Sequence, residues 1–302
     1  MKLVKWLLIT FTFLIAIILF NTLSFTQEQI ELTPLLDNSS IDQSAVTVRL
    51  SQAIQHKTIS FADKSDRKPK SFHEFHQFLA KNFPLLHQNL TQKKVNDLSL
   101  LYEWKGTDDS LKPMLLMSHL DVVPVDQETQ EQWAHAPFAG TIAEGIIWGR
   151  GAVDIKSGVM GIMEAIENLL TQDYQPKRSV YLAFGHDEEL GGEQGAKKIA
   201  KYLKTQGISF ELILDEGGSI VSDGVIPGID SQIALIGIAE KGYVSLKLTA
   251  SGVGGHSSMP PKHTALGEIS QAIVNIENNP FPANLTYSKQ LFGNIGPRSE
   301  ER

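Results

Sequence analysis

Six side chains that can bind metal ions or move protons stand where apolar runs end or where glycines are dense. These residues are His119, Asp121, Asp154, Glu188, Glu189 and Asp215. Each of them alone would be an ordinary solvated side chain, and a His-x-Asp pair is common by chance. Their shared position at the ends of apolar runs favours a common site.

His119 and Asp121 follow the apolar run 114–117, which is typical of a buried strand. Residues two apart in an extended chain face the same side, so both side chains should point beyond the carboxyl end of that strand. One side chain can bind a metal ion, and the other can orient the first side chain or the water molecule beside it. The pair therefore predicts a histidine ligand with a supporting aspartate.

A cysteine-free set of histidine and carboxylates suits two divalent metal ions, with zinc expected and cobalt or manganese as alternatives. Two ions about 3.5–4 Å apart need a bridging carboxylate, which we expect to be Asp154. His119 and Asp215 would complete the shell of one ion, and Glu189 would bind the other.

The adjacent carboxylates Glu188 and Glu189 should point in different directions, because neighbours in an extended segment do so. One can then be a ligand while the other faces the water molecule that the ions activate. A carboxylate there can take a proton from water and pass it to a leaving amine. The reaction class that this predicts is metal-assisted hydrolysis of an amide.

The elements that must position these residues alternate between strand and helix. Strands are expected at 98–104, 114–119, 178–184 and 210–214, and helices at 46–55, 72–82, 157–170 and 193–205. Such alternation favours an α/β fold with a mostly parallel sheet, whose ligands bind beyond the carboxyl ends of the strands. The glycine-rich segment 149–158 is no phosphate-binding loop, because Ile155 stands where that motif needs glycine.

Four motifs together resemble the M20 metallopeptidase family, most closely its carboxypeptidase S and N-fatty-acyl-amino-acid hydrolase branch. They lie at 118–124, 148–158, 184–192 and 254–258. The resemblance covers about residues 45–280. It implies a three-layer αβα zinc-hydrolase catalytic domain with an inserted α+β lid domain.

The same resemblance implies a role for each site residue. It implies His119, Asp154, Glu189 and Asp215 as metal ligands with Asp154 bridging, Glu188 as general base, and Asp121 as the residue that orients the site. His256 matches a lid histidine that polarises the scissile carbonyl, which suits an imidazole. His73, His76 and His87 are expected to be solvent-facing polar residues, and His135, His186 and His263 are expected to be structural or surface residues.

The chain divides into four expected segments. They are a membrane anchor or signal segment (1–24), a linker (25–44), the N-terminal part of the catalytic domain (45–240), and the start of the lid or dimerisation domain (241–302), with a strand at 242–250 and a helix at 265–278. In the family the chain returns after the lid and brings a last histidine ligand. In this chain the sheet, the lid and one metal site are therefore expected to be incomplete. Residues 1–302 alone are expected to be inactive or nearly so.

The N-terminal segment places Lys2 and Lys5 before a stretch, 6–27, that carries no charge. As a helix this stretch spans about 33 Å, enough for the hydrocarbon core of a bilayer. An uncleaved anchor through 6–22 would leave the lysines in the cytoplasm. A signal cleaved near Thr22 and Ser24 is the alternative. The catalytic domain is thus expected outside the cytoplasm, anchored or secreted.

Composition excludes several other classes. The net charge of −7 and the lack of a basic stripe argue against nucleic-acid binding, and the lack of cysteine excludes thiolate metal sites and a cysteine nucleophile. The leading hypothesis is a dizinc amidohydrolase that acts on small peptides with a free C-terminus or on N-acyl amino acids, with a homodimer through the lid. The alternatives are an aminoacylase-type deacetylase of the same family and a non-catalytic truncated remnant.

Overall fold

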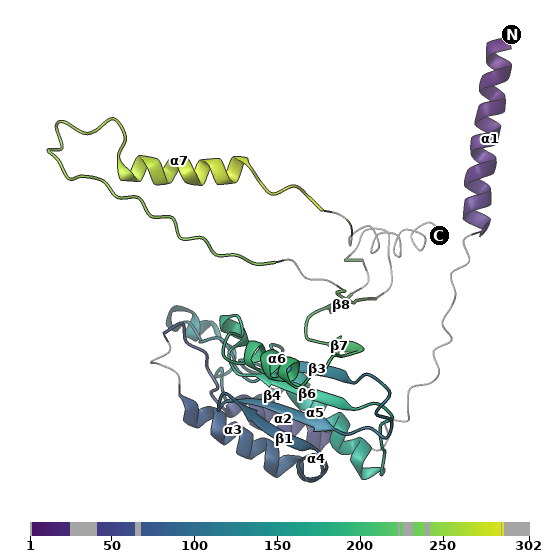
Figure 1. Ribbon diagram of the computed structural model, residues 1–302, viewed down its shortest axis with the longest axis vertical. Coiled ribbons are helices and arrows are strands. Elements are labelled where there is room, and N and C mark those ends of the chain that lie inside the picture. Colours follow the sequence, from purple (N-terminus) through teal and green to yellow (C-terminus); the bar gives the residue numbers. More distant parts are fainter. Residues whose placement is uncertain are drawn as a thin grey trace. The chain divides into compact units, whose positions relative to one another are not determined.

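A five-stranded mixed sheet forms the centre of the first of two compact units (Figure 1). The computed structural model describes residues 2–24, 41–63, 68–222, 224–225, 232–238, 242–284 and 286. The units are Met1–Leu214 and Asp215–Arg302. The linker expected at 25–44 lies mostly outside the described residues.

The strand order in the sheet is β1-β2-β6-β3-β7. Its strands are β1 (Thr91–Val95), β2 (Ser99–Trp104), β3 (Met114–His119), β6 (Val180–Gly185) and β7 (Leu212–Leu214). β3 runs parallel to β6 and to β7, whereas β1, β2 and β6 pair antiparallel. Three carboxyl ends, those of β3, β6 and β7, therefore meet at one edge of the sheet.

Helices cover both faces of this sheet, so the first unit has the three-layer αβα arrangement that the family resemblance implies. The expectation of a mostly parallel sheet is wrong, because two of the four strand pairings in this sheet are antiparallel. The helices are α2 (Gln43–Gln55), α3 (Pro69–Asn82), α4 (Pro84–Asn89), α5 (Lys156–Thr171) and α6 (Ala196–Thr205). A hairpin of β4 (Thr141–Ala143) and β5 (Ile146–Trp148) and two 3₁₀ helices, η3 (Gln127–Gln132) and η4 (Glu188–Leu190), lie between them.

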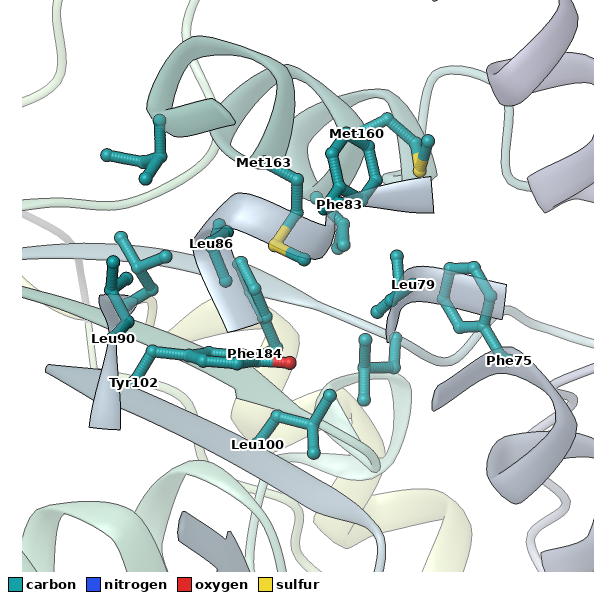
Figure 2. Close-up of a cluster of buried hydrophobic side chains, with 14 of the residues drawn as sticks. Phe75, Leu79, Phe83, Leu86, Leu90, Leu100, Tyr102, Met160, Met163 and Phe184 are labelled. Carbon is teal, nitrogen blue, oxygen red and sulfur yellow. The ribbon is translucent and has the colours of Figure 1, made fainter. Parts of the chain in front are cut away.

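The larger core lies between the sheet and the helices α2 to α5 (Figure 2). Alternate residues of a strand face opposite sides, and on β2 and β6 Leu100, Tyr102 and Phe184 all face this core. Met160 and Met163 of α5 pack onto the same cluster. The intervening strand residues, with Ile199 and Leu203 of α6, form a second cluster on the other face. Burial on both faces explains why these strands are continuous apolar runs.

The N-terminal helix α1 (Lys2–Ser24) confirms the helix expected there. Its span Val4–Leu23 has a mean hydropathy of 2.3, and none of it is buried. By length and composition it could cross a membrane, although a signal sequence would satisfy the same criteria.

The second unit contains a two-stranded ribbon, β8 (Ser219–Val221) with β9 (Ile233–Leu235), and the helix α7 (Ala265–Asn278). The helix expected at 265–278 is confirmed, and Thr264 caps its first turn. The strand expected at 242–250 is wrong, because these residues form no ladder with any part of the chain that the structure describes. Its apolar set remains exposed, with Leu246 at 74%.

Three other differences concern the first unit. The polar strand β1, Thr-Gln-Lys-Lys-Val, and the short helix α4 were not expected. His76 was expected to face solvent, but it is only 6% exposed and belongs to the buried face of α3. No metal cluster forms around it within the described ranges.

Candidate metal centre

Three of the predicted site residues lie at the carboxyl ends of β3 and β6. His119 is the last residue of β3 and lies opposite Gly185, the last residue of β6. The two glutamates follow β6 in η4, and Asp215 follows β7 directly. The register thus brings the ends of segments far apart in the sequence to one edge, as expected for a sheet with parallel strands.

His119 is buried and lies among carboxylates. Its Nε2 atom is 3.1 Å from Oδ1 of Asp154 and 3.6 Å from Oε2 of Glu188. Its Nδ1 atom lies 2.9 Å from the carbonyl oxygen of Asp121, which can only accept a hydrogen bond. Nδ1 can therefore donate its hydrogen to this carbonyl, and Nε2, which lies among carboxylates, is the ring nitrogen that would bind a cation.

Asp121 is completely buried and holds several parts of the site together. Its Oδ1 atom lies 3.3 Å from Nδ1 of His119 and accepts the N–H of Glu188 at 3.1 Å. Its Oδ2 atom accepts the N–H of Glu189 at 3.3 Å and the hydroxyl of Ser60 at 2.6 Å. These contacts suit the orienting role that the sequence predicts for this residue.

Asp154 projects from the glycine-rich segment that leads into α5, and its side chain is 66% exposed. The segment is anchored by Lys156, whose ammonium donates to the carbonyl oxygens of Ala53, at 2.9 Å, and His56. This ammonium also lies 4.7 Å from the centre of the Phe75 ring. Burial lowers the pKa of Lys156 to about 7. The end of α2 thus fixes the chain two residues after Asp154.

The loop after β6 is fixed by Asp187. This buried carboxylate accepts the N–H groups of Gln194, at 2.8 Å, and Gly195, at 2.7 Å. A Cβ atom on Gly195 would lie 2.7 Å from the same carboxylate, so glycine is required by space. The loop closes around η4 and presents Glu188 and Glu189 to the site.

Glu189 gives the test of whether these residues fit a cation. Its Oε1 atom is buried and has no hydrogen-bond partner among the residues that the structure describes. Burial, and then the neighbouring Asp154 carboxylate, raise the pKa of Glu189. A buried carboxylate oxygen without a donor, close to other carboxylates, calls for positive charge. An imidazole lone pair with carboxylates and no thiolate is a donor set that zinc, cobalt and manganese accept. The side chains of this site therefore fit a divalent metal ion.

The two remaining predicted residues belong to the second unit. Asp215 is exposed, and its Oδ1 atom accepts the N–H of Glu216 at 2.9 Å. His256 is exposed, and its Nδ1 atom lies 2.8 Å from the hydroxyl of Ser258. Their roles stay predictions.

Three supporting residues were not predicted for this site: Ser60, Lys156 and Asp187. Lys156 and Asp187 stand inside motifs that the sequence analysis singled out. The sequence around Ser60 carries no signal of its own.

The chain is similar to a family model and to several known proteins. A family model described as Peptidase family M20/M25/M40 matches residues 115–292. The chain is 43% identical over 291 residues to a probable carboxypeptidase S-like protein (number 2) of Dictyostelium discoideum, covering 94% of this chain and 56% of that protein.

Two further relatives are similar at nearly the same level. Carboxypeptidase S of Saccharomyces cerevisiae is 39% identical over 264 residues, covering 86% of this chain and 45% of that protein. An N-fatty-acyl-amino acid synthase/hydrolase of Mus musculus is 40% identical over 246 residues, covering 81% and 48%. The chain thus spans about half the length of the curated relatives that it matches.

Proposed function

This chain belongs to peptidase family M20/M25/M40, and we propose that the protein hydrolyses an amide bond in small peptides with a free C-terminus or in N-acyl amino acids. The names of the relatives support both substrate classes. The observation that carries the proposal is the approach of His119 Nε2 to the carboxylates of Asp154 and Glu188, together with the buried Glu189 oxygen that has no hydrogen-bond partner among the described residues.

We assign His119, Asp154 and Glu189 as ligands of two divalent metal ions, with zinc as the expected metal and Asp154 as the shared ligand. Asp215 is proposed as a further ligand because the family resemblance implies it. When bound, such ions polarise the scissile carbonyl and lower the pKa of a water molecule toward about 7.

Glu188 is proposed as the general base. Its side chain is 52% exposed, so it can meet a substrate and a water molecule. Asp121 fixes its backbone, and its Oε2 atom lies 3.6 Å from Nε2 of His119. It would take a proton from the attacking water as oxygen bonds to the carbonyl carbon, and deliver that proton to the amine nitrogen as the C–N bond breaks.

Three further assignments belong to the same proposal. The apolar helix α1 serves as a membrane anchor or signal, with the catalytic unit outside the cytoplasm. His256 polarises the scissile carbonyl, a role that imidazole chemistry supports. The second unit provides a homodimer contact.

The test is Glu188→Gln in the purified full-length protein. The amide keeps the shape of the side chain and cannot take a proton, so we expect kcat to fall by about 10²–10⁴-fold while Zn²⁺ still binds. The matched control is Glu193→Gln, an exposed glutamate that pairs with Lys197, and it should keep full turnover. EDTA should abolish hydrolysis, and added Zn²⁺ should restore it.

Substrate class is tested with an N-blocked dipeptide, a long-chain N-acyl amino acid and an N-acetyl amino acid. We expect the first or second to be cleaved best. Preference for the acetylated substrate would favour the aminoacylase-type alternative. Unchanged turnover in Glu188→Gln would exclude Glu188 as the base, and a wild-type protein that neither binds Zn²⁺ nor hydrolyses any of the three would exclude the proposal.

A further inference from the structure

We infer that Ser60 is a positioning residue of the metal centre, an inference that rests on the proposed function. Ser60 lies 61 residues before Asp121 in the chain and is 2% exposed. Its hydroxyl donates to Oδ2 of Asp121 at 2.6 Å, the shortest hydrogen bond that this carboxylate accepts. The carbonyl oxygen of His186 lies 3.4 Å from the same hydroxyl.

The backbone around Ser60 is fixed against the segment that follows β3. The N–H of Ser60 donates to the carbonyl oxygen of Val122 at 3.0 Å, and the N–H of Val122 donates to that of Thr58 at 3.0 Å. Ile59 and Val122 form a parallel bridge. Backbone hydrogen bonds therefore fix residues 58–60, outside the main sheet, in the position from which the Ser60 hydroxyl contacts Asp121.

The hydroxyl acts on two parts of the site through one carboxylate. Oδ2 of Asp121 also accepts the N–H of Glu189, and Oδ1 contacts His119 and the N–H of Glu188. Rotation of this carboxylate would move its contacts to the imidazole and to both glutamates at once. A donor at 2.6 Å on Oδ2 limits that rotation, which is the way outer hydrogen-bond partners tune metal sites.

The experiment measures Zn²⁺ affinity by chelator competition in the full-length protein. Ser60→Ala should weaken Zn²⁺ binding by about 10–100-fold. Ser60→Thr keeps the hydroxyl and should bind far more tightly than Ser60→Val, which introduces a side chain of the same shape as threonine without the hydroxyl. The visible spectrum of the Co²⁺-loaded protein should change in Ser60→Val and stay close to wild type in Ser60→Thr.

The control is Thr58→Val. Thr58 is fully buried in the same segment, and its hydroxyl donates to the carbonyl oxygen of Leu120 at 2.6 Å without touching the Asp121 carboxylate. The Thr58→Val variant should have a lower free energy of unfolding but the same Zn²⁺ affinity as the wild-type protein. Equal affinity in the Ser60→Thr and Ser60→Val variants, or an equal loss in Thr58→Val, would overturn the inference while leaving the proposed function standing. A wild-type protein that binds no Zn²⁺ would overturn both.

Discussion

The backbone N–H of Glu188 donates to the carboxylate of Asp121 at 3.1 Å, across 67 residues of sequence. Asp121 follows β3, and Glu188 follows β6, the neighbouring parallel strand. The adjacent N–H, that of Glu189, donates to the other oxygen of the same carboxylate. One buried side chain thus sets the backbone from which both glutamates project.

Asp121→Asn should therefore impair the whole centre. The amide has one acceptor oxygen, and its NH₂ group would face a backbone N–H or the Ser60 hydroxyl. We expect Zn²⁺ affinity to fall by about 10–100-fold and the free energy of unfolding to fall by about 1–3 kcal/mol. Isothermal titration calorimetry and urea unfolding measure the two effects.

The matched control for Asp121→Asn is Asp109→Asn, which alters an exposed aspartate that pairs with Lys105. It should leave both quantities unchanged. If Asp121→Asn bound Zn²⁺ as the wild-type protein does, Asp121 would have no orienting role, and the Ser60 inference would lose its basis.

Lys156→Met should lower stability and disturb the segment that carries Asp154. Methionine fills a similar volume but donates nothing, so the carbonyl oxygens of Ala53 and His56 lose a buried donor. The expected loss is about 1–3 kcal/mol in the free energy of unfolding. Lys198→Met, on the exposed face of α6, should change it by no more than about 0.5 kcal/mol. A Lys156→Met protein as stable as wild type would show that burying the charge costs as much as its hydrogen bonds contribute.

Much of the first unit could be predicted because its signals are local. The strands β2, β3 and β6 are apolar on both faces, and α5 and α6 have helical spacing. The shared edge of His119 and Glu188 follows from the parallel pairing of β3 and β6. By contrast, β1 is a polar edge strand with two lysines, and only its pairing with β2 reveals it.

Supporting residues were harder to predict than ligands because their roles depend on long-range contacts. Ser60 is one serine among many in the sequence, and its importance comes from packing against residues 121 and 186. The alternating pattern at 242–250 predicted a strand that the structure does not contain. An apolar face needs a partner, and none covers it in the described part of the second unit.

His76 is a second residue whose environment the sequence did not reveal, and it makes stability depend on pH. Its Nε2 atom lies 3.0 Å from the carbonyl oxygen of Leu98, so Nε2 donates. Its Nδ1 atom is buried without a partner among the described residues. Burial lowers the pKa of His76 to about 4, from 6.5 in an exposed histidine.

The sign of this effect follows from proton uptake. Between about pH 6.5 and 4 the unfolded chain binds the proton that folded His76 rejects, so stability falls as pH falls through this window. From these two pKa values the loss between pH 8 and pH 5 is about 2 kcal/mol. Urea unfolding at both pH values should show this share of the loss in the wild-type protein and in His263→Gln, which changes an exposed histidine of the second unit. His76→Leu should lack it, since leucine does not titrate. An equally steep decline in His76→Leu would assign the pH dependence to other groups.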